Sequence, residues 1–431
     1  MIRIYDRKDI EDSSIFSRST AAADLSAPVA EIISEVRAHG DAALREYGER
    51  FDRVEKGALA SLQVSEAEIS QALSEVEPEF IEVLREAANN IEAYHKKQLR
   101  DSFVMTEREG VVLGQRVLPL ARVGIYVPGG TAAYPSTVLM NAIPARIAGV
   151  SEIVMTTPPA RDGSVNPCIL AAASVAGVTK IFKVGGAQAI AALAYGTESV
   201  PQVDKIAGPG NAYVAEAKKQ VFGQVNIDMI AGPSEILVLA DGKSDPAFVA
   251  ADLLSQAEHD KMASAVLVTD SMELAEKVQA ELERQLPLLS REEIARVSID
   301  TNGKIIVAKD LREGIAIANR IAPEHLEICV DNPFDYLSEI QNAGSVFLGR
   351  YNPEPMGDYF AGPNHTLPTL GTARFYSPLS VDDFIKKMQF SYYTKEALKQ
   401  DYHKVSMFAK KEGLTAHARA VDIRFGEEQQ G

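Results

Sequence analysis

A glutamine and a histidine at the end of one apolar stretch are the first residues in this sequence that could do chemistry. In LLSQAEHD, Gln256 and His259 stand three positions apart, so on a helix they share one face. The pair Asp245-Pro246 would begin that helix well. Taken alone, the motif favours a solvated polar face, because zinc is usually bound by cysteine, histidine or carboxylates rather than glutamine. Half of a metal site is the alternative.

A second pair of chemical groups stands in RIAPEHLEI, where Pro323 ends a predicted helix just before a strand. Glu324 and His325 are adjacent there, and a carboxylate beside an imidazole could serve as two proton-transfer groups. By itself the pair is more often structural. The imidazole of His325 would then bond to the last helical turn, and Glu324 would face water.

Three glycine-rich turns lead towards predicted helices: YVPGG (126–130), KVGGAQ (183–188) and AGPGNAYV (207–214). Such turns expose backbone N–H groups that can hold phosphate. None of them has the GxGxxG or P-loop pattern, so alone they do not predict nucleotide binding. Ordinary strand-to-helix turns are the alternative.

The chain has seven histidines, and five of them lie in its second half. We expect His39 and His95, in the N-terminal helical part, at the surface. Three of the other five stand beside acidic or amide residues in short polar motifs. This grouping suggests a metal or proton-transfer site if folding brings the residues together. The five are His259, His325, His365, His403 and His417.

Short β-branched runs alternate with helical segments from about residue 121 onward. This pattern predicts parallel sheets covered by helices on both faces. The series restarts near residue 235, so we expect two doubly wound, Rossmann-like domains in tandem. The predicted strands are 122–127, 152–157, 180–184 and 225–230, then 235–240, 264–269, 304–308, 325–330 and 344–349.

The flanking segments have other textures. Residues 1–25 look irregular, and helical apolar spacing follows. Residues 351–379 form a long Pro- and Gly-rich loop, a kind that is usually functional or disordered. A helical tail is predicted from Ser380 to the end. The predicted N-terminal helices are 28–50, 65–76 and 78–97.

The composition is globular, with 431 residues, 46% of them hydrophobic, and a net charge of −16. An acidic chain repels phosphate backbones, so we expect no nucleic-acid partner. The charged N-terminus argues against a secretory signal. The uncharged stretch 123–145 is interrupted by proline and glycine, so we expect a strand, a turn and a helix rather than a membrane span. With only two cysteines, Cys168 and Cys329, the chain suits a reducing compartment, and we expect it in the cytoplasm.

Taken together, the motifs resemble one known family, the histidinol dehydrogenases. The similar segments follow in that family's order and cover about residues 36–425. The resemblance implies a zinc enzyme that oxidises L-histidinol to L-histidine through histidinal with two NAD+. It also implies a homodimer with an intertwined C-terminal tail. The segments are YVPGG, KVGGAQAIAALAYGT, IAGPGNAYV, AGPSEILVLAD, LLSQAEHD, NRIAPEHLEI, MGDYFAGPNHTLPTLGTARF and KKEGLTAHARAV.

The resemblance carries residue roles onto matching positions. Glu324 and His325 would be the catalytic residues. One zinc ion per subunit would be held by Gln256, His259, Asp358 of MGDY and His417 of GLTAH.

Substrate and cofactor positions follow in the same way. The substrate would contact the zinc ligands and His325, together with Ser234 of GPSE and Glu412 of EGLTAH. NAD would lie near Tyr126, Gln188 and Asn211. One departure is Pro355, where the family often has alanine or serine, and it puts the position of the Asp358 loop in doubt.

The residue types suit the implied reaction. A mixed nitrogen and oxygen ligand set leaves room at zinc for the imidazole and amine of histidinol. An imidazole with an ordinary pKa of about 6.5, at His325, can take the alcohol proton. Glu324 can activate the water that hydrates the aldehyde.

Two rival interpretations remain, the first within the same enzyme class and the second outside it. A zinc- and NAD-dependent dehydrogenase for another alcohol, such as a sulfonated diol, would want arginine or lysine near the metal, where Glu412 stands. A non-enzymatic binding relative would not need the complete set of metal and catalytic residues.

The predicted domains combine these elements. Residues 1–25 would be an extension, and 122–232 a Rossmann-like domain on the NAD side. Residues 26–121 and 233–379 would form a discontinuous Rossmann-like domain with the metal and catalytic residues. Residues 380–431 would be a helical tail for dimerisation and completion of the active site.

Overall fold

The structure, a computed structural model, describes residues 1–6, 16, 24–129 and 133–426. The chain forms two compact units. Unit 1 comprises residues 1–99 and 120–384, and unit 2 comprises residues 100–119 and 385–431. Within the described residues, no helix has both the length and the apolar character that crossing a bilayer requires.

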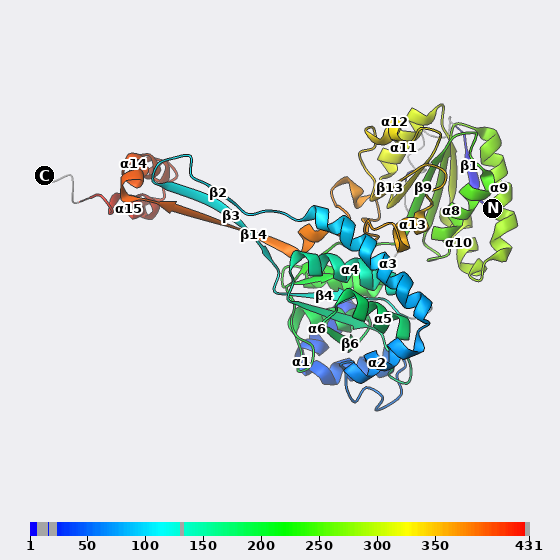
Figure 1. The fold of residues 1–431 in the computed structure, drawn as a ribbon, viewed down its shortest axis with the longest axis horizontal. Coiled ribbons are helices and arrows are strands. Elements are labelled where there is room, and N and C mark those ends of the chain that lie inside the picture. Colours follow the sequence, from blue (N-terminus) through cyan, green and yellow to red (C-terminus); the bar gives the residue numbers. More distant parts are fainter. Residues whose placement is uncertain (7–15, 17–23, 130–132, 427–431) are drawn as a thin grey trace. The chain divides into compact units, whose positions relative to one another are not determined.

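The larger sheet of unit 1 has six strands in the order β1-β11-β10-β9-β12-β13, and every neighbouring pair is parallel. The order reverses between β9 and β12, as in a doubly wound sheet. Helices α8 (Pro246–Ala257), α9 (Met272–Gln285) and α10 (Glu292–Asn302) share a core with one face, and α11 (Leu311–Ile321) packs on the other (Figure 1). The strands are β1 (Arg3–Tyr5), β9 (Glu235–Ala240), β10 (Ser264–Thr269), β11 (Lys304–Val307), β12 (His325–Cys329) and β13 (Ser345–Leu348).

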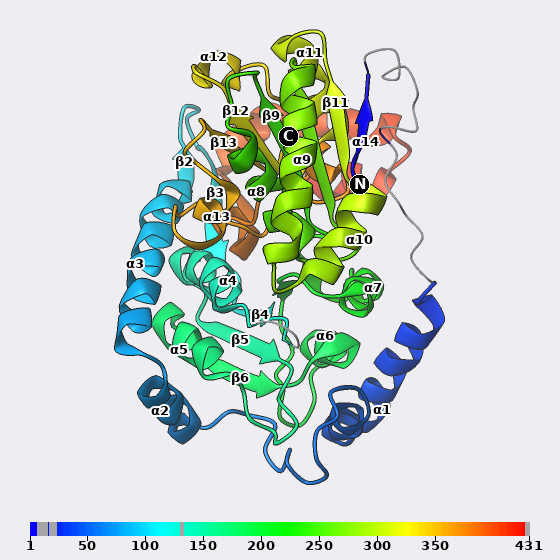
Figure 2. The same ribbon diagram turned by 90° about the vertical axis from the view of Figure 1, so that its right-hand side faces the viewer.

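The smaller sheet of unit 1 has five parallel strands in the order β6-β5-β4-β7-β8. One core joins this sheet to α2 (Glu66–Glu75), α3 (Pro78–His95), α4 (Pro135–Ala148) and α5 (Pro167–Ala176). A second core joins it to α1 (Ser26–Phe51), α6 (Gly186–Tyr195) and α7 (Ala212–Val221), and Figure 2 shows α5 and α6 flanking the sheet. The strands are β4 (Arg122–Tyr126), β5 (Glu152–Thr157), β6 (Lys180–Lys183), β7 (Lys205–Ala207) and β8 (Asn226–Ile227).

The predicted fold class, α/β with two doubly wound parallel sheets, is confirmed by these strand orders. The uncharged stretch 123–145 forms β4 and α4, as expected, apart from residues 130–132, which lie outside the described part. Part of the glycine-rich turn 126–130 falls in the same gap. β7 was missed because three residues carry too little periodicity to stand out.

The grouping of residues 26–121 with 233–379 was wrong for the three N-terminal helices. Their apolar faces, including Val36 of α1 and Leu84 of α3, belong to the cores of the five-stranded sheet. Sequence order did not reveal this, because a helix can pack on any sheet that offers a complementary apolar face. Residues 1–25 are not wholly irregular either: Arg3–Tyr5 pairs with β11, and Ile2 is buried beside it. Residues 7–15 and 17–23 lie outside the described part.

Unit 2 combines an antiparallel sheet with two helices. Its strands are β2 (Phe103–Met105), β3 (Val111–Pro119) and β14 (Ile385–Tyr393), in the order β14-β3-β2. The helices are α14 (Lys395–Lys411) and α15 (Thr415–Asp422). The prediction of a helical tail from Ser380 was therefore wrong for Ile385–Tyr393, because the partner strand that defines it lies far upstream in the sequence.

The long loop 351–379 holds one short helix, α13 (Glu354–Tyr359). Helix α10 and the β2–β3 hairpin were not predicted. The remaining short elements are α12 (Phe334–Leu337) and the 3₁₀ turns Lys96–Gln98, Leu286–Leu288, Thr372–Arg374 and Val381–Phe384.

Candidate active site

The predicted catalytic pair lies at the amino end of β12, between β9 and the edge strand β13 of the six-stranded sheet. His325 pairs with Ile236 of β9 on one side and Ser345 of β13 on the other. Glu324 is 7% exposed and His325 is 3% exposed. The alternative in which Glu324 faces water is therefore wrong, since its side chain is buried.

Hydrogen bonding fixes the imidazole of His325. Its Nδ1 lies 3.0 Å from the carbonyl oxygen of Glu235, and because a carbonyl only accepts, Nδ1 carries the proton. Nε2 faces two carboxylates, at 3.6 Å from Glu354 Oε1 and 3.9 Å from Asp358 Oδ1. Burial lowers the pKa of His325, against the opposing effect of Asp358. The ring is thus held neutral, with Nε2 available as a base.

The carboxyl of Glu324 is held by the same backbone position. The N–H of Glu235 donates to Glu324 Oε2 at 2.8 Å. Burial raises the pKa of Glu324 well above its usual range, which makes it a stronger base for a water proton. Gly344 allows this packing, because a Cβ there would lie 2.5 Å from the Glu324 carbonyl oxygen. Ser234 precedes Glu235, so it lies at the same edge of the sheet.

The predicted metal ligands of unit 1 come from the ends of two helices. Gln256 lies in the last turn of α8 and is 1% exposed. His259 follows that helix, and its N–H donates to the carbonyl oxygen of Gln256 at 3.1 Å. Asp358 lies in α13. The solvated polar face that LLSQAEHD alone favoured is wrong for Gln256, whose side chain points into the protein.

Two neighbours of these predicted ligands, the acidic Glu354 and the basic His365, were given no role from the sequence. Glu354 is 2% exposed, and burial raises its pKa to about 10, with Asp358 adding to the effect. His365 Nδ1 lies 3.7 Å from Asp358 Oδ1. The spacing of Glu354 and Asp358, four residues apart, was a usable signal, since such residues share a helix face. Pro355 lies in the first turn of α13, where proline is well tolerated.

These groups suit a divalent cation. His325, Glu354 and Asp358 offer ligand atoms that all lie within 4.8 Å of one another. Within the described residues, His325 Nε2 and Glu354 Oε1 are buried without a hydrogen-bond partner. Buried polar atoms of this kind are costly unless a ligand, ion or water satisfies them. The mixture of imidazole nitrogen and carboxylate oxygen is one that zinc accepts.

A second acidic pair, Asp252 and Glu327, stabilises the start of α13. The N–H of Glu354 donates to Glu327 Oε1 at 2.7 Å. Burial raises the pKa of Asp252 to about 6 and that of Glu327 well above its usual range. Two carboxyls so placed share a proton rather than both ionise. This pair therefore holds the start of α13, which carries Asp358, with one negative charge rather than two.

Glu412 and His417 belong to unit 2. Glu412 ends α14, and His417 lies in α15; both are exposed on that unit. Their part in the metal and substrate site stays a prediction.

The residues predicted to lie near NAD gather at the carboxyl edge of the five-stranded sheet. Tyr126 ends β4, and its hydroxyl accepts from the N–H of Gly186 at 3.1 Å. Gln188 lies in the first turn of α6, buried, with no hydrogen-bond partner for Nε2 in the described part of the chain. Asn211 caps α7, accepting from the N–H groups of Tyr213 and Val214. Ligands of doubly wound sheets bind at this edge.

A buried ion pair fixes the turn that carries Asn211. Lys218 donates to Asp228, and both side chains are almost fully buried. Lys218 Nζ also donates to the carbonyl oxygen of Gly208 at 3.0 Å, while the N–H of Gly208 donates to Asp228 Oδ2 at 2.8 Å. Gly208 has φ of 116°, and a Cβ there would lie 2.1 Å from the carbonyl oxygen of Tyr126. The turn thus packs directly on β4.

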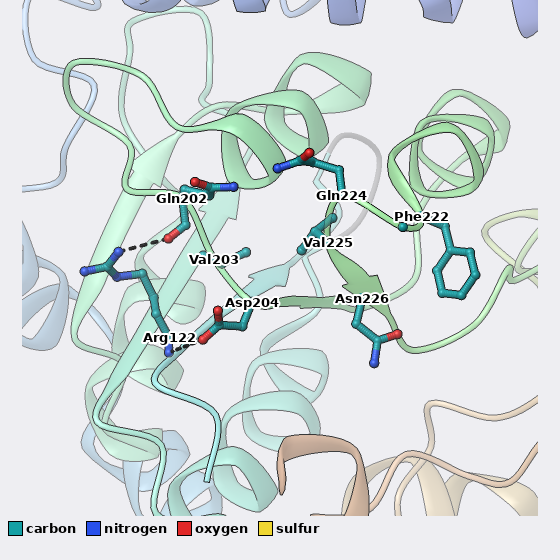
Figure 3. Close-up of a pocket in the computed structure, with 9 residues that line it drawn as sticks. Arg122, Gln202, Val203, Asp204, Phe222, Gln224, Val225 and Asn226 are labelled. Carbon is teal, nitrogen blue, oxygen red and sulfur yellow. Dashed lines mark hydrogen bonds between the residues drawn. The ribbon is translucent and has the colours of Figure 1, made fainter. Parts of the chain in front are cut away.

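An open cavity of about 670 Å³ lies at the opposite, amino edge of this sheet (Figure 3). Arg122 and Asn226, which line it, begin β4 and β8. It is separate from the groups at the carboxyl edge. Its polar wall is already paired, because Arg122 donates to the carbonyl oxygen of Gln202 and its backbone N–H to Asp204.

Two smaller expectations are settled as well. His95 is fully buried rather than at the surface, because its ring turns inward to the carbonyl oxygen of Ile91 at 2.8 Å. His39 is exposed, as expected. Both cysteines are free, and burial raises the pKa of each thiol, so neither is an activated thiolate.

Comparison with known proteins gives one consistent result. A sequence profile described as histidinol dehydrogenase matches residues 16–425. The histidinol dehydrogenase of Clostridium acetobutylicum is 58% identical over 394 residues, 91% of each chain. That of Listeria monocytogenes serovar 1/2a is 58% identical over 400 residues, 93% of each chain. The crystal structure of histidinol dehydrogenase from Elizabethkingia anophelis covers 99% of both chains with a TM-score of 0.93 and 39% identity.

Proposed function

Because the chain belongs to the histidinol dehydrogenase family, we propose that it oxidises L-histidinol to L-histidine through L-histidinal, using two NAD+. This is the last stage of histidine biosynthesis. The observation that carries the proposal is the state of His325. Its Nδ1 is committed to the carbonyl of Glu235, and its Nε2 is buried, unprotonated and turned towards Glu354 and Asp358.

One zinc ion would be held by Gln256, His259, Asp358 and His417. When bound, it supplies a Lewis acid that binds the imidazole and amine nitrogens of the substrate and so orients the alcohol. Ser234 and Glu412 would add contacts to the substrate. The burial of Gln256 at the end of α8 supports this assignment over a solvated polar face.

The two proton-transfer roles follow from the environments of Glu324 and His325. His325 Nε2 takes the hydroxyl proton in the first oxidation, and its hydrogen bond to Glu235 stabilises the imidazolium that forms. Glu324, with its raised pKa, takes a proton from the water that adds to the aldehyde. After His325 has released its first proton to solvent, the hydrate gives its hydroxyl proton to His325 Nε2 in the second oxidation.

NAD+ would lie at the carboxyl edge of the five-stranded sheet, near Tyr126, Gln188 and Asn211. When bound, it accepts a hydride in each oxidation. Tyr126 keeps its proton, because burial raises its pKa to about 12, so its hydroxyl is a donor or acceptor without charge. The N-termini of α6 and α7 at this edge favour the negative phosphates.

The assembly and setting are part of the proposal. Unit 2 of one subunit would complete the active site of a homodimer by carrying Glu412 and His417 to it. Exposed apolar side chains of that unit, among them Phe408, Met407 and Val104, support burial against a partner. The free cysteines and the acidic net charge suit a cytoplasmic enzyme without a nucleic-acid or membrane partner.

The test is the amount of NADH formed per L-histidinol consumed, with the reaction run to completion. Two NADH per substrate are expected, with the activity lost on chelation and restored by zinc. One NADH per substrate would limit the enzyme to a single oxidation. A zinc-loaded dimer that forms no NADH from L-histidinol would contradict the proposed substrate.

A further inference from the structure

Asp52 is a half-buried residue with one carboxylate oxygen that no described residue satisfies. It ends α1, where its N–H donates to the carbonyl oxygen of Gly48 at 3.1 Å. Its Oδ2 is buried and accepts no hydrogen bond from any described residue. Burial alone raises the pKa of Asp52 to about 6, so it is ionised at neutral pH with nothing to compensate the charge. A lone buried carboxylate is costly, and proteins keep one where a ligand will satisfy it.

The carboxylate lies at the carboxyl edge of the five-stranded sheet. A Cβ built on Gly185 would lie 3.2 Å from Asp52 Oδ1 and 2.7 Å from Pro158 Cγ. Gly185 is the N-cap of α6, after β6, and Pro158 directly follows β5. Asp52 therefore lies beside the carboxyl ends of two neighbouring strands, β5 and β6, although α1 is not the helix that follows either of them in the sequence.

Other unsatisfied groups surround the same point. Gln188 is 99% buried with Nε2 unpartnered, and its amide lies 2.7 Å from where a Cβ of Gly186 would be. Thr156 and Thr157, at the end of β5, have buried hydroxyls that also lack partners among the described residues. The Tyr126 hydroxyl accepts from the N–H of Gly186, next to Gly185, so it lies at the same edge of the sheet as the Asp52 carboxylate. Donors and acceptors left open together indicate a polar ligand rather than an apolar one.

The strand order of the sheet indicates which part of a bound dinucleotide would lie beside Asp52. The strand order reverses between β4 and β7, and a dinucleotide lies across that crevice with one nucleotide on each side. β5 and β6 lie on the side of the first strands, where doubly wound folds hold the adenosine ribose through an acidic residue. Here no acidic residue ends β5, since Pro158 and Pro159 follow Thr157. Asp52 supplies the carboxylate from outside the sheet.

We propose that Asp52 accepts hydrogen bonds from the 2′- and 3′-hydroxyls of the adenosine ribose and so makes the enzyme prefer NAD+ to NADP+. This rests on the proposed function only in taking the ligand to be a nicotinamide dinucleotide. Two vicinal hydroxyls offer two donors to the two carboxylate oxygens. A 2′-phosphate would instead place a second negative group against an uncompensated carboxylate.

The experiment is calorimetric titration of the full-length, zinc-loaded protein with NAD+, NADP+ and adenosine-side 2′-deoxy-NAD+. Wild type should bind NAD+ at least tenfold more tightly than either other ligand. Asp52→Asn should bind NAD+ about tenfold more weakly, the loss expected for one charged hydrogen bond. It should also reduce the preference over both NADP+ and the deoxy analogue to about threefold or less. Glu55→Gln, which removes the same charge from an exposed neighbour, should behave as wild type.

The outcomes separate the inference from the proposed function. If wild type binds NAD+ and Asp52→Asn keeps the wild-type affinities for all three ligands, Asp52 does not contact the ribose and the inference is overturned. If wild type binds none of the three, the proposed cofactor fails, and the inference with it. Loss of folding is not expected, because Asp52 Oδ2 accepts no hydrogen bond from the described residues, and the circular dichroism spectrum of Asp52→Asn checks this.

Discussion

Removing one member of the buried pair Lys218–Asp228 should destabilise the five-stranded domain severely. Both side chains are about 2% exposed or less. Lys218→Met leaves the Asp228 carboxylate buried and without its cation, while the N–H groups of Gly208 and Met229 still point at it. Breaking a buried pair in this way costs about 3–5 kcal/mol. For a domain of this size that corresponds to a fall in Tm of roughly 6–20 °C.

A second substitution makes the prediction specific to charge. Asp228→Asn, combined with Lys218→Met, removes the stranded charge but keeps an oxygen that can accept from Gly208. The double variant should regain more than half of the lost stability. Urea and thermal unfolding followed by circular dichroism, at one protein concentration, would measure both variants. The reasoning is refuted if Lys218→Met unfolds within about 1 kcal/mol of wild type, or if the double variant is no more stable than the single one.

The same variants should affect cofactor binding. The pair holds the turn at Gly208, and that turn carries the cap Asn211. Lys218→Met should therefore weaken NAD+ binding at temperatures where the protein is still folded. The double variant should bind NAD+ more tightly than Lys218→Met does, so that the order of affinities follows the order of stabilities.

Three further predictions follow. Glu324→Gln should slow the oxidation of added histidinal, which needs hydration, far more than that of L-histidinol; equal losses in the two half-reactions would show that Glu324 does not serve the hydration step. Asp52→Asn should stabilise the ligand-free protein by up to about 3 kcal/mol at pH 8 but little at pH 4. The reason is that burial raises the pKa of Asp52 in the folded protein to about 6, so the charged form becomes unfavourable as pH rises. If the variant and wild type have equal urea midpoints at pH 8 as well as at pH 4, this prediction is contradicted. Truncation at Ser380 should abolish stoichiometric zinc as well as activity, since it removes His417; retained zinc, measured by metal analysis of the folded protein, would place the fourth ligand elsewhere.

Much of the fold was predictable because the strands of parallel sheets are buried on both faces. EILVLA and SAVLVT are continuous apolar runs, and they form β9 and β10 with the predicted bounds. The failures have a different origin. β14 is defined by pairing with β3, a contact between distant segments that no local pattern records. The N-terminal helices were assigned to the wrong sheet for the same reason.

The candidate site divides in the same way. Gln256, Glu324, His325 and Asp358 were predicted because their motifs match a family. The motifs around Gln256 and around Glu324-His325 alone favoured an exposed or structural interpretation. Burial reverses that choice, and burial is a property of the packed sheet rather than of the motif. Asp52 carried no signal at all in the sequence, since an acidic residue after a helix is ordinary. Only its place beside Gly185 and Pro158 makes it a candidate.

The nine-residue pairing of β3 with β14 also has a consequence for how the protein is made. β3 leaves the ribosome early, and nearly all of unit 1 is synthesised before β14 follows. Until then, the β2–β3 hairpin has only its own two strands, and Phe103, Val104 and Leu113 are exposed even in the finished unit. A two-stranded hairpin is marginally stable in water. Nascent chains that stop before residue 385 therefore present an open, apolar strand edge, and this edge is where we expect chaperones to bind and aggregation to begin.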